Sequence, residues 1–512
     1  MFCERGAFHM KTKRALAWLL TLLTVGSTLI ACGNPSRPQS DETPNEPTGT
    51  AGTVTDIPTD AVTDTRELTD LEIRQSIDDG VGVYDFGGRT FRIVSEESKT
   101  LNHYFVNEDN GDPCDTSVLK RNDRIEQRLN IKIDAISIND SLSEMIEMVE
   151  TGQSVGEIYA VYAHRMYQPV EKHIFYNWYD IPVINLDQPW YNQYSNEQAT
   201  IKGVLYSLYS SLSITSLTKL CVIFFNERLA ENYGIGKQNL YDTVNEGKWT
   251  IDRFIELSKD VYQDTNLNNE KDKEDLYGMA YINYEPTDTF LTAFNIPFTE
   301  VNDDGTLSFT FETQFDRFVS AADKMREYNM CQGVLLDDDD DPITIFVDGR
   351  SVFCAAWLEY CFNEFKDMED VYQILPYPKW NEEQEGYYTT AQDEYHLYGV
   401  PKTVASDDFT FVGAVMEVMS AETYKHVYPV YYENALKGRY SKDPQTAKMV
   451  DIIANGSRLE FAYQYGLSHF AKMPYLFRTA VVKNASAVTS QWTIMKRGID
   501  THINNFYDLF TD

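Results

Sequence analysis

Apolar and polar positions in the first folded part of the chain predict strands and helices in turn. Residues 88–95 (GRTFRIVS) and 131–138 (IKIDAISI) alternate between apolar and polar, as strands with one buried face do. Residues 115–130 and 140–152 place apolar side chains three or four positions apart, which predicts helices. A short apolar run follows at 157–164. This order is typical of βαβ units, so we expect a parallel sheet with helices on its faces.

A second series of elements follows an aromatic, proline-punctuated stretch at 177–195. Residues 219–234 indicate a buried strand and then a helix, and residues 248–263 predict a helix with Thr250 as its N-cap. The remaining pattern predicts a strand at 276–282, a long helix at 311–329, a buried strand within 348–360, extended stretches at 371–380 and 394–403, and mainly helices from Asp407 onward. Two such series in 512 residues predict two domains of ordinary size.

The N-terminus has the pattern of a secretory signal peptide. A basic cluster, Lys11 to Arg14, precedes an apolar run from Ala15 to Ala31, and Met10 is the expected start. The run is short for a membrane-spanning helix, and no charged stop-transfer flank follows it. We therefore assign residues 1–31 to a signal peptide.

The residues around Cys32 suggest how the exported chain is held. Leu29-Ile30-Ala31-Cys32 resembles the lipobox of bacterial lipoproteins, and the resemblance implies cleavage before Cys32 and lipidation of its sulfur. The alternative is a plain signal peptide with a chance cysteine. Residues 32–69 are rich in Pro, Thr, Asp, Glu, Gly and Ser and bury too little apolar surface to fold, so we predict a disordered tether.

Charge and cysteine content narrow the class of partner. The net charge is −35 and no basic stripe interrupts it, which argues against nucleic acid and anionic lipid surfaces as ligands. Five cysteines follow Cys32, an odd and sparse set for a chain of this length. We predict mostly buried thiols, and the sequence leaves a single disulfide open.

Several stretches together resemble one family, the extracellular solute-binding proteins (family 1) of carbohydrate-uptake ABC transporters. They are VIFFNERLAENYGI, GKWTIDRFIELSKDVYQDTN, LYGMA, IFVDGRSVFCAAW, YQILPYPKW and LYGVPKT, in that order along the chain. The resemblance implies an α/β, two-lobed periplasmic-binding-protein-like fold (type II) with lobes joined by crossing hinge strands. It places lobe 1 at 70–185, with 343–395 returning to it, and lobe 2 at 186–342, with a helical C-terminal part at 396–512.

Candidate ligand-binding residues follow from this fold. Ligands of open α/β sheets bind beyond the carboxyl ends of strands, and sugar rings stack on aromatic side chains while their hydroxyls need polar partners. The residues that meet these conditions are Tyr162, His164, Trp190, Tyr191, Trp357, Glu359, Tyr360, Asp393, Glu394 and Tyr395. Trp357 with Glu359 is the first choice, because the family has ligand-facing residues after the matching strand. The alternative for any single aromatic residue is packing in the core.

Residues 264–275 (DTNLNNEKDKED) have the spacing of a calcium loop. The candidate ligands are Asp264, Asn266, Asn268, Glu270, Asp272 and Asp275. Asn269 stands where such loops usually have Gly, and Lys271 and Lys273 lie inside the loop. The sequence therefore leaves two interpretations, a structural Ca²⁺ site and a solvated acidic turn.

No catalytic motif supports an enzyme. The sequence has no nucleophile elbow, His-Glu-x-x-His motif, phosphate-binding loop or dinucleotide fingerprint. We expect a monomeric, lipid-anchored binding protein on the extracellular face of the cell membrane, which captures a carbohydrate and delivers it to ABC transporter permease subunits. The alternatives are a glycoside hydrolase at the same surface, a binding protein for a peptide or another polar solute, and a sensor for a membrane receptor.

Overall fold

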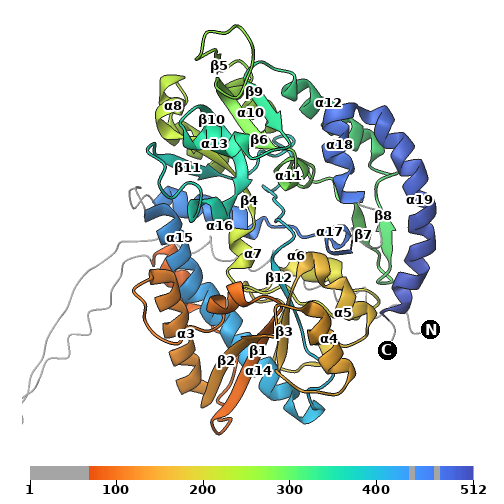
Figure 1. Cartoon of the computed structure of the whole chain (residues 1–512). Helices are drawn as coiled ribbons and strands as arrows, with labels where there is room; N and C mark the ends of the chain where they lie inside the picture. The colour runs from red at the N-terminus through yellow and green to blue at the C-terminus, as the bar shows by residue number, and fades with distance from the viewer. Residues whose placement is uncertain (1–67, 438–443, 466–472, 511–512) are drawn as a thin grey trace, which may run out of the picture. The chain divides into compact units, whose positions relative to one another are not determined.

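A computed structural model describes residues 68–437, 444–465 and 473–510 (Figure 1). These residues form one compact unit, and the predicted signal peptide and most of the predicted tether lie outside the described residues. Within the described ranges, no helix combines the length and apolarity that crossing a bilayer requires.

The first lobe is built on a four-stranded sheet in the order β12-β3-β1-β2. Strand β1 pairs in parallel with β2 and β3, which confirms the predicted βαβ units, and β12 joins in antiparallel orientation. Its strands and main helices are β1 (Arg89–Ser95), β2 (Ile131–Ser137), β3 (Ile158–Tyr162), β12 (His396–Gly399), α3 (Pro113–Leu129), α4 (Leu142–Glu150), α5 (Tyr167–Glu171) and α14 (Phe409–Glu422).

Alternation along β1 explains why helices cover both faces of this sheet. Phe91 and Ile93 belong to the same core as Ile125 of α3 and Phe411 of α14. The next residue, Val94, belongs to the core that contains α4. Successive side chains of a strand point to opposite faces, so a buried residue on each face requires a helix on each side.

The second lobe is built on a sheet in the order β11-β4-β10-β6-β5, with β9 also paired to β6. Its strands and helices are β4 (Cys221–Asn226), β5 (Tyr262–Gln263), β6 (Leu276–Ile282), β9 (Val334–Asp337), β10 (Ser351–Trp357), β11 (Tyr372–Leu375), α8 (Glu227–Asn232), α9 (Lys237–Asn245), α10 (Ile251–Ser258), α11 (Glu285–Ala293), α12 (Phe315–Asn329) and α13 (Asp341–Val347). The Thr250 side chain accepts a hydrogen bond from the Arg253 amide and caps α10, as predicted.

The sheets correct the predicted lobe boundaries. Residues 343–395 were expected in lobe 1, but β10 and β11 lie in the second sheet, where β10 pairs with β4 and β6. Residues from 396 onward were expected in lobe 2, but β12 pairs with β3 and α14 packs on the first sheet. The prediction was wrong because an apolar strand pattern records burial and does not record which sheet supplies the neighbour.

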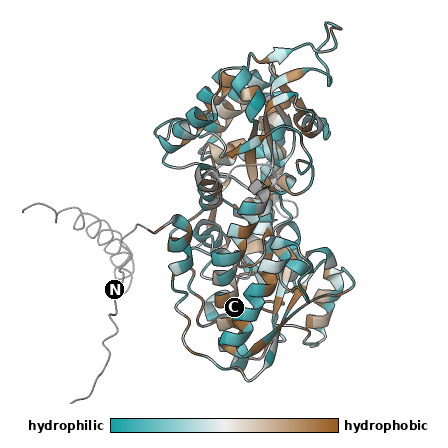
Figure 2. Cartoon of the chain, turned by 90° about the vertical axis from the view of Figure 1, so that its left-hand side faces the viewer, coloured by the Kyte–Doolittle hydropathy of each residue, from teal (hydrophilic) through white to brown (hydrophobic). Residues whose placement is uncertain are grey.

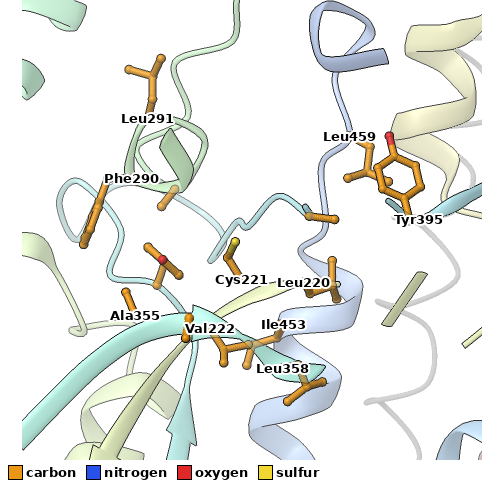
Figure 3. Close-up of a cluster of buried hydrophobic side chains, with 14 of the residues drawn as sticks. Leu220, Cys221, Val222, Phe290, Leu291, Ala355, Leu358, Tyr395, Ile453 and Leu459 are labelled. Carbon is orange, nitrogen blue, oxygen red and sulfur yellow. The ribbon is translucent and has the colours of Figure 1, made fainter. Parts of the chain in front are cut away.

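Two crossing segments join the lobes, as the family resemblance implied; the first spans residues 208–220 and the second spans residues 391–398. Leu208 pairs with Tyr398 and Leu220 with Ala391, both in antiparallel orientation. Apolar side chains fill the space where these segments meet β10 and the C-terminal helices, and Figure 3 shows Leu220, Leu358 and Ile453 directed toward one another. The chain crosses a third time through η6 (Thr423–Val427) and α15 (Tyr428–Lys437).

The C-terminal helices complete the second lobe. Helix α16 (Pro444–Asn455) packs on β11, and α18 (Leu476–Lys483) and α19 (Ala485–Asp508) pack on α12. The short helix α17 (Phe461–Tyr465) instead contacts η2 (Ala163–Arg165), which follows β3 of the first lobe. The hairpin of β7 (Thr299–Val301) and β8 (Leu307–Phe309) is tied to α19, because the Tyr507 hydroxyl donates to the Leu307 carbonyl at 2.8 Å. Coloured by hydropathy, the helices carry both hydrophilic and hydrophobic residues, as expected of elements with one buried face (Figure 2).

The cysteines behave as predicted. All five that follow Cys32 are free thiols in the described structure, and all but Cys331 are buried. Burial raises the pKa of the Cys221, Cys354 and Cys361 thiols, so these groups stay protonated and act as small apolar side chains.

Candidate functional site

Polar side chains from both lobes gather beyond the carboxyl ends of the central strands. Strand β1 is followed by Glu96 and Glu97, and β3 runs from Tyr162 into His164. On the second lobe, β10 ends at Trp357 and leads into η4 (Leu358–Cys361), which carries Glu359. Ligands of open α/β sheets bind at this end of the strands, so the arrangement identifies a candidate binding cleft.

Lys219 occupies the middle of this polar cluster. Its Nζ lies 2.6 Å from Glu359 Oε2 and 3.4 Å from Glu394 Oε2, and its side chain is 12% exposed. Lys219 and Glu394 belong to the crossing segments, whereas Glu359 belongs to the second lobe. The ammonium group therefore joins the crossing segments to one wall of the cleft.

Lys99 contributes from the first lobe. Its Nζ lies 2.8 Å from Glu97 Oε2, and the hydrogen bond to Glu97 raises the pKa of the lysine. The charges of Glu394 and Glu359 raise the same pKa further. Because these charges act on one another, groups from both lobes and from the crossing segments form one electrostatic unit.

Tyr162 and His164 form an aromatic stack at the end of β3. The Tyr162 ring stacks on His396 at 4.8 Å between centroids and on His164 at 6.0 Å, with interplanar angles of 5° and 16°. The Tyr162 hydroxyl donates to Glu97 at 3.4 Å, and burial raises its pKa. Tyr162 is only 3% exposed, so it packs beneath the surface of the cleft. The His164 side chain is 27% exposed and can contact a ligand.

His164 also ties β3 to the second crossing segment. Its Nδ1 lies 3.1 Å from the Asp393 carbonyl oxygen and 3.8 Å from Asp393 Oδ1. Burial raises the pKa of the Asp393 carboxyl, and the charge of His164 lowers it. A protonated His164 therefore stabilises the charged form of Asp393 at this junction.

The structure adds Arg478, Glu285 and Asp288, which the sequence analysis missed. Arg478 lies 3.2 Å from Glu285 and also bonds Asp288, and its guanidinium lies 4.2 Å from the centroid of the Tyr475 ring. Burial raises the pKa of Asp288 to about 7, and its Oδ1 accepts no hydrogen bond from the residues that the structure describes. The one local signal was the polar run EPTD shortly after strand 276–282, at the strand's carboxyl end.

Trp357 and Tyr360 supply aromatic surface on the second lobe. Their ring centroids are 5.2 Å apart with an interplanar angle of 73°, and both side chains are half-buried. Trp357 Nε1 is buried and donates no hydrogen bond among the described residues. An indole usually finds an acceptor when buried, so this donor is available to a ligand oxygen.

Three of the predicted ligand-binding residues lie elsewhere, in the core. Trp190 and Tyr191 are buried, and both donate hydrogen bonds to Glu417, at 3.0 and 2.8 Å. Tyr395 is 1% exposed and packs near Tyr209, and Figure 3 shows its ring beside Leu459. The structure brings together the other seven, Tyr162, His164, Trp357, Glu359, Tyr360, Asp393 and Glu394, at the ends of β3 and β10 and on the second crossing segment.

The predicted calcium loop follows β5 and closes through its own hydrogen bonds. Asp272 accepts from the side-chain amides of Asn266 and Asn268, and buried Asp275 accepts from the Tyr262 hydroxyl at 2.7 Å. The Asp264 carboxylate accepts from the Asn269 amide, and Glu270 is exposed. No three His, Cys, Asp or Glu side chains within the described ranges converge as metal ligands do. Asp272 and Asp275 thus already have partners, whereas Asp264 Oδ1 is buried without a hydrogen bond among the described residues. Calcium binding stays a prediction. Asn269 has the left-handed backbone (φ 63°) expected of that loop position.

Comparison with known proteins supports the fold. No family model and no curated protein matches the sequence. Similar solved structures include a cyclo/maltodextrin-binding protein complexed with maltotetraose (12% identity, TM-score 0.52, 81% of this chain and 98% of that chain covered). Others are the galacto-N-biose-/lacto-N-biose I-binding protein of an ABC transporter from Bifidobacterium longum (14%, 0.51, 84% and 99%) and the cyclic alpha-maltosyl-1,6-maltose binding protein from Arthrobacter globiformis (12%, 0.51, 82% and 100%). These likenesses confirm the predicted two-lobed solute-binding fold.

Proposed function

We propose that this chain is the substrate-binding component of an ABC importer and captures an extracellular carbohydrate, an oligosaccharide, in the cleft between its lobes. The observation that carries the proposal is the polar cluster around Lys219, where groups from both lobes and the crossing segments lie beside aromatic rings. Aromatic faces stack on sugar rings, and carboxylates accept hydrogen bonds from sugar hydroxyls. Two solved structures of the same fold, in complex with maltotetraose and with lacto-N-biose, support this choice of ligand.

The proposed mechanism is closure of the lobes around the ligand. A ligand that contacts Glu359 on one lobe and His164 on the other has more contacts when the lobes are close, so it favours the closed state. The crossing segments that pair Leu208 with Tyr398 are the hinge in this proposal. No bond in the ligand is made or broken, and the closed protein is the form that permease subunits receive.

The proposed location follows from the N-terminus. Cys32, which lies outside the described residues, would carry the lipid anchor at the extracellular face of the cell membrane. The segment 33–67, also outside the described residues, would link that anchor to a monomeric binding unit. An anchored protein remains near its permease without needing tight binding to it.

A thermal-unfolding screen of the full chain against mono- and oligosaccharides tests the proposal. A ligand that binds only the folded state raises stability by about 2.7 kcal/mol at a hundredfold excess over Kd. We expect a shift with one glycan family and recovery of that glycan unchanged. Turnover of the glycan, abolished by Glu359→Gln, would instead establish a glycoside hydrolase. No shift with any sugar would refute the carbohydrate ligand and direct the screen to peptides and other polar solutes.

A further inference from the structure

A second cavity lies apart from the cleft. Its volume is about 370 Å³, at the small end of the range for ligand pockets, roughly 300–1,000 Å³. None of the polar groups around Lys219 described above lines it. Its walls come from α2 (Asp70–Ser76), residues 189–194 at the start of α6 (Gln193–Ala199), the first crossing segment, Tyr388, η6, α15, α16 and the residues that follow α16.

The lining of this cavity is aromatic and carries a positive charge. Its charged side chains, among the residues the structure describes, are Arg74, Asp451 and Arg458. Arg74 forms an ion pair with Asp451 and lies over the Tyr424 ring, 4.4 Å from its centroid. Pairing Arg74 with Asp451 leaves the charge of Arg458 in excess, in a chain whose net charge is −35.

Arg458 is held in place without a carboxylate partner. Its guanidinium lies 3.3 Å from the centroid of the Tyr388 ring and 4.8 Å from that of Tyr194. Its side-chain hydrogen bond goes to the neutral Asn295 amide oxygen, and it forms no ion pair within the described part of the chain. Burial raises the pKa of the nearby Glu460 carboxyl and the charge of Arg458 lowers it, but the two side chains form no ion pair. Glu460 is buried and accepts a hydrogen bond from the Phe298 backbone amide at 2.7 Å.

One buried donor in the cavity lacks an acceptor. The Arg74 side chain is 11% exposed, and its Nη1 is buried and makes no hydrogen bond to a residue that the structure describes. A buried donor without an acceptor destabilises the folded protein, so an oxygen atom placed in the cavity would be stabilised there.

We propose that this cavity is a second ligand site that takes a small carboxylate with a ring-shaped body, of the size of a hexuronic acid. The Arg458 guanidinium lies over the Tyr388 ring and donates through Nη1 to Asn295, and its remaining N–H groups are the ones that would meet a carboxylate. The tyrosine faces accept the ring, and Arg74 Nη1 donates to a ring oxygen or hydroxyl. Asp451 disfavours a second carboxylate near Arg74, which limits the ligand to one acidic group.

Isothermal titration of the full chain with glucuronate and with glucose tests the proposal. We expect saturable glucuronate binding that is at least about tenfold tighter than glucose binding. Arg458→Gln is expected to weaken glucuronate binding by about tenfold or more, whereas Arg253→Gln, a surface arginine paired with Glu256, leaves it unchanged.

Three outcomes would overturn the proposal. They are no glucuronate binding up to about 10 mM, equal binding of glucose, and loss of glucuronate binding in Glu359→Gln with retention in Arg458→Gln. The last outcome would place the anion in the cleft. Comparing the two ligands on the unchanged chain needs no variant, so the test survives if Arg458→Gln fails to fold. Binding of a neutral oligosaccharide in the cleft is measured separately, so either proposal can fail alone.

Discussion

Lys219 Nζ lies 2.6 Å from Glu359 Oε2, although the two residues are 140 positions apart in the chain. Lys219 precedes β4 on the first crossing segment, and Glu359 follows β10 on the second lobe. The same ammonium lies 3.4 Å from Glu394, which belongs to the second crossing segment. One lysine thus links the three pieces of chain that meet at the cleft.

Replacing this lysine by Met should weaken ligand binding by about tenfold or more. The change removes a hydrogen-bonded charge pair worth about 1.5–3 kcal/mol and leaves Glu359 and Glu394 close together without a cation. Titration with the glycan found in the thermal screen gives the affinity. Lys248→Met is the matched control, because Lys248 and its partner Glu246 are both 57% exposed. Equal affinity in Lys219→Met and the control would exclude Lys219 from the binding site.

Glu417 should make the free energy of unfolding depend on pH. Its buried carboxyl group accepts hydrogen bonds from Trp190 and Tyr191, and burial raises its pKa to about 7, from an ordinary value of 4.5. Between these values the folded protein keeps a proton that the unfolded chain releases, so this contribution to stability falls as pH rises toward 7. The loss is about 3 kcal/mol over that interval.

The variant Glu417→Gln isolates this effect. Gln cannot ionise, so its stability curve from urea unfolding at about pH 5 and about pH 8 should lack the slope that Glu417 contributes. Any hydrogen bond lost in the variant changes stability by the same amount at both pH values. Glu246→Gln, at an exposed site, should retain the wild-type slope. Parallel curves for wild type and Glu417→Gln would show that Glu417 is ionised throughout.

Two glycines in helices should respond to alanine in opposite directions. A Cβ at Gly413 in α14 would lie 1.9 Å from the Pro182 carbonyl oxygen, whereas one at Gly498 in α19 meets nothing within 4 Å. Gly413→Ala should therefore lower the free energy of unfolding by about 1–3 kcal/mol through overpacking. Gly498→Ala should raise it by up to about 1 kcal/mol through helix propensity. Chemical denaturation measures both; a Gly413→Ala protein as stable as the wild type would contradict the packing of α14 on Pro182.

Cys32→Ser should release the protein from the membrane. The acyl chains contribute about 0.8 kcal/mol for each buried CH₂, and serine cannot carry a thioether-linked lipid. Expression in a bacterial host, fractionation and metabolic labelling with a fatty acid would show the wild type in the membrane fraction. A Cys114→Ser variant, which removes a buried thiol in α3, is the control. Membrane retention and labelling of Cys32→Ser would refute the anchor.

Calcium should bind the loop at 264–275 weakly. The side-chain amides of Asn266 and Asn268 donate to Asp272. Both side chains must turn their oxygens toward the centre of the loop before a cation can take the place of these two hydrogen bonds. We expect a Kd in the range of about 10⁻⁴ to 10⁻³ M, with a higher Tm in calcium for the wild type and no shift for Asp272→Asn. Magnesium should not substitute. An unchanged Tm at about 10 mM calcium would favour the solvated acidic turn.

Local patterns were enough to predict most of the helices and strands. The alternation of apolar and polar residues at 131–138 correctly predicted strand β2. The Thr250 cap and the helical spacing of apolar residues correctly predicted α10, because both signals act within a few residues. The order of elements was also enough for the parallel pairing of β1 with its two neighbours. The candidate ligand-binding residues that directly follow β3 and β10 could be predicted as well, because the end of a strand can be recognised from the local sequence pattern.

By itself, then, the sequence determined most of the elements and the parallel core of the first lobe, which rest on local periodicity and on the order of the elements, whereas the two-lobed class was implied by its resemblance to a known family. Only the tertiary structure decided that β10 and β11 belong to the second sheet and that Tyr395, Trp190 and Tyr191 pack in the core. Only the tertiary structure brought Arg478 to Asp288, which lies 190 positions earlier. The physical reason is that a side chain's own pattern records whether it is buried, whereas its partner is set by contacts between distant segments, which no local spacing encodes.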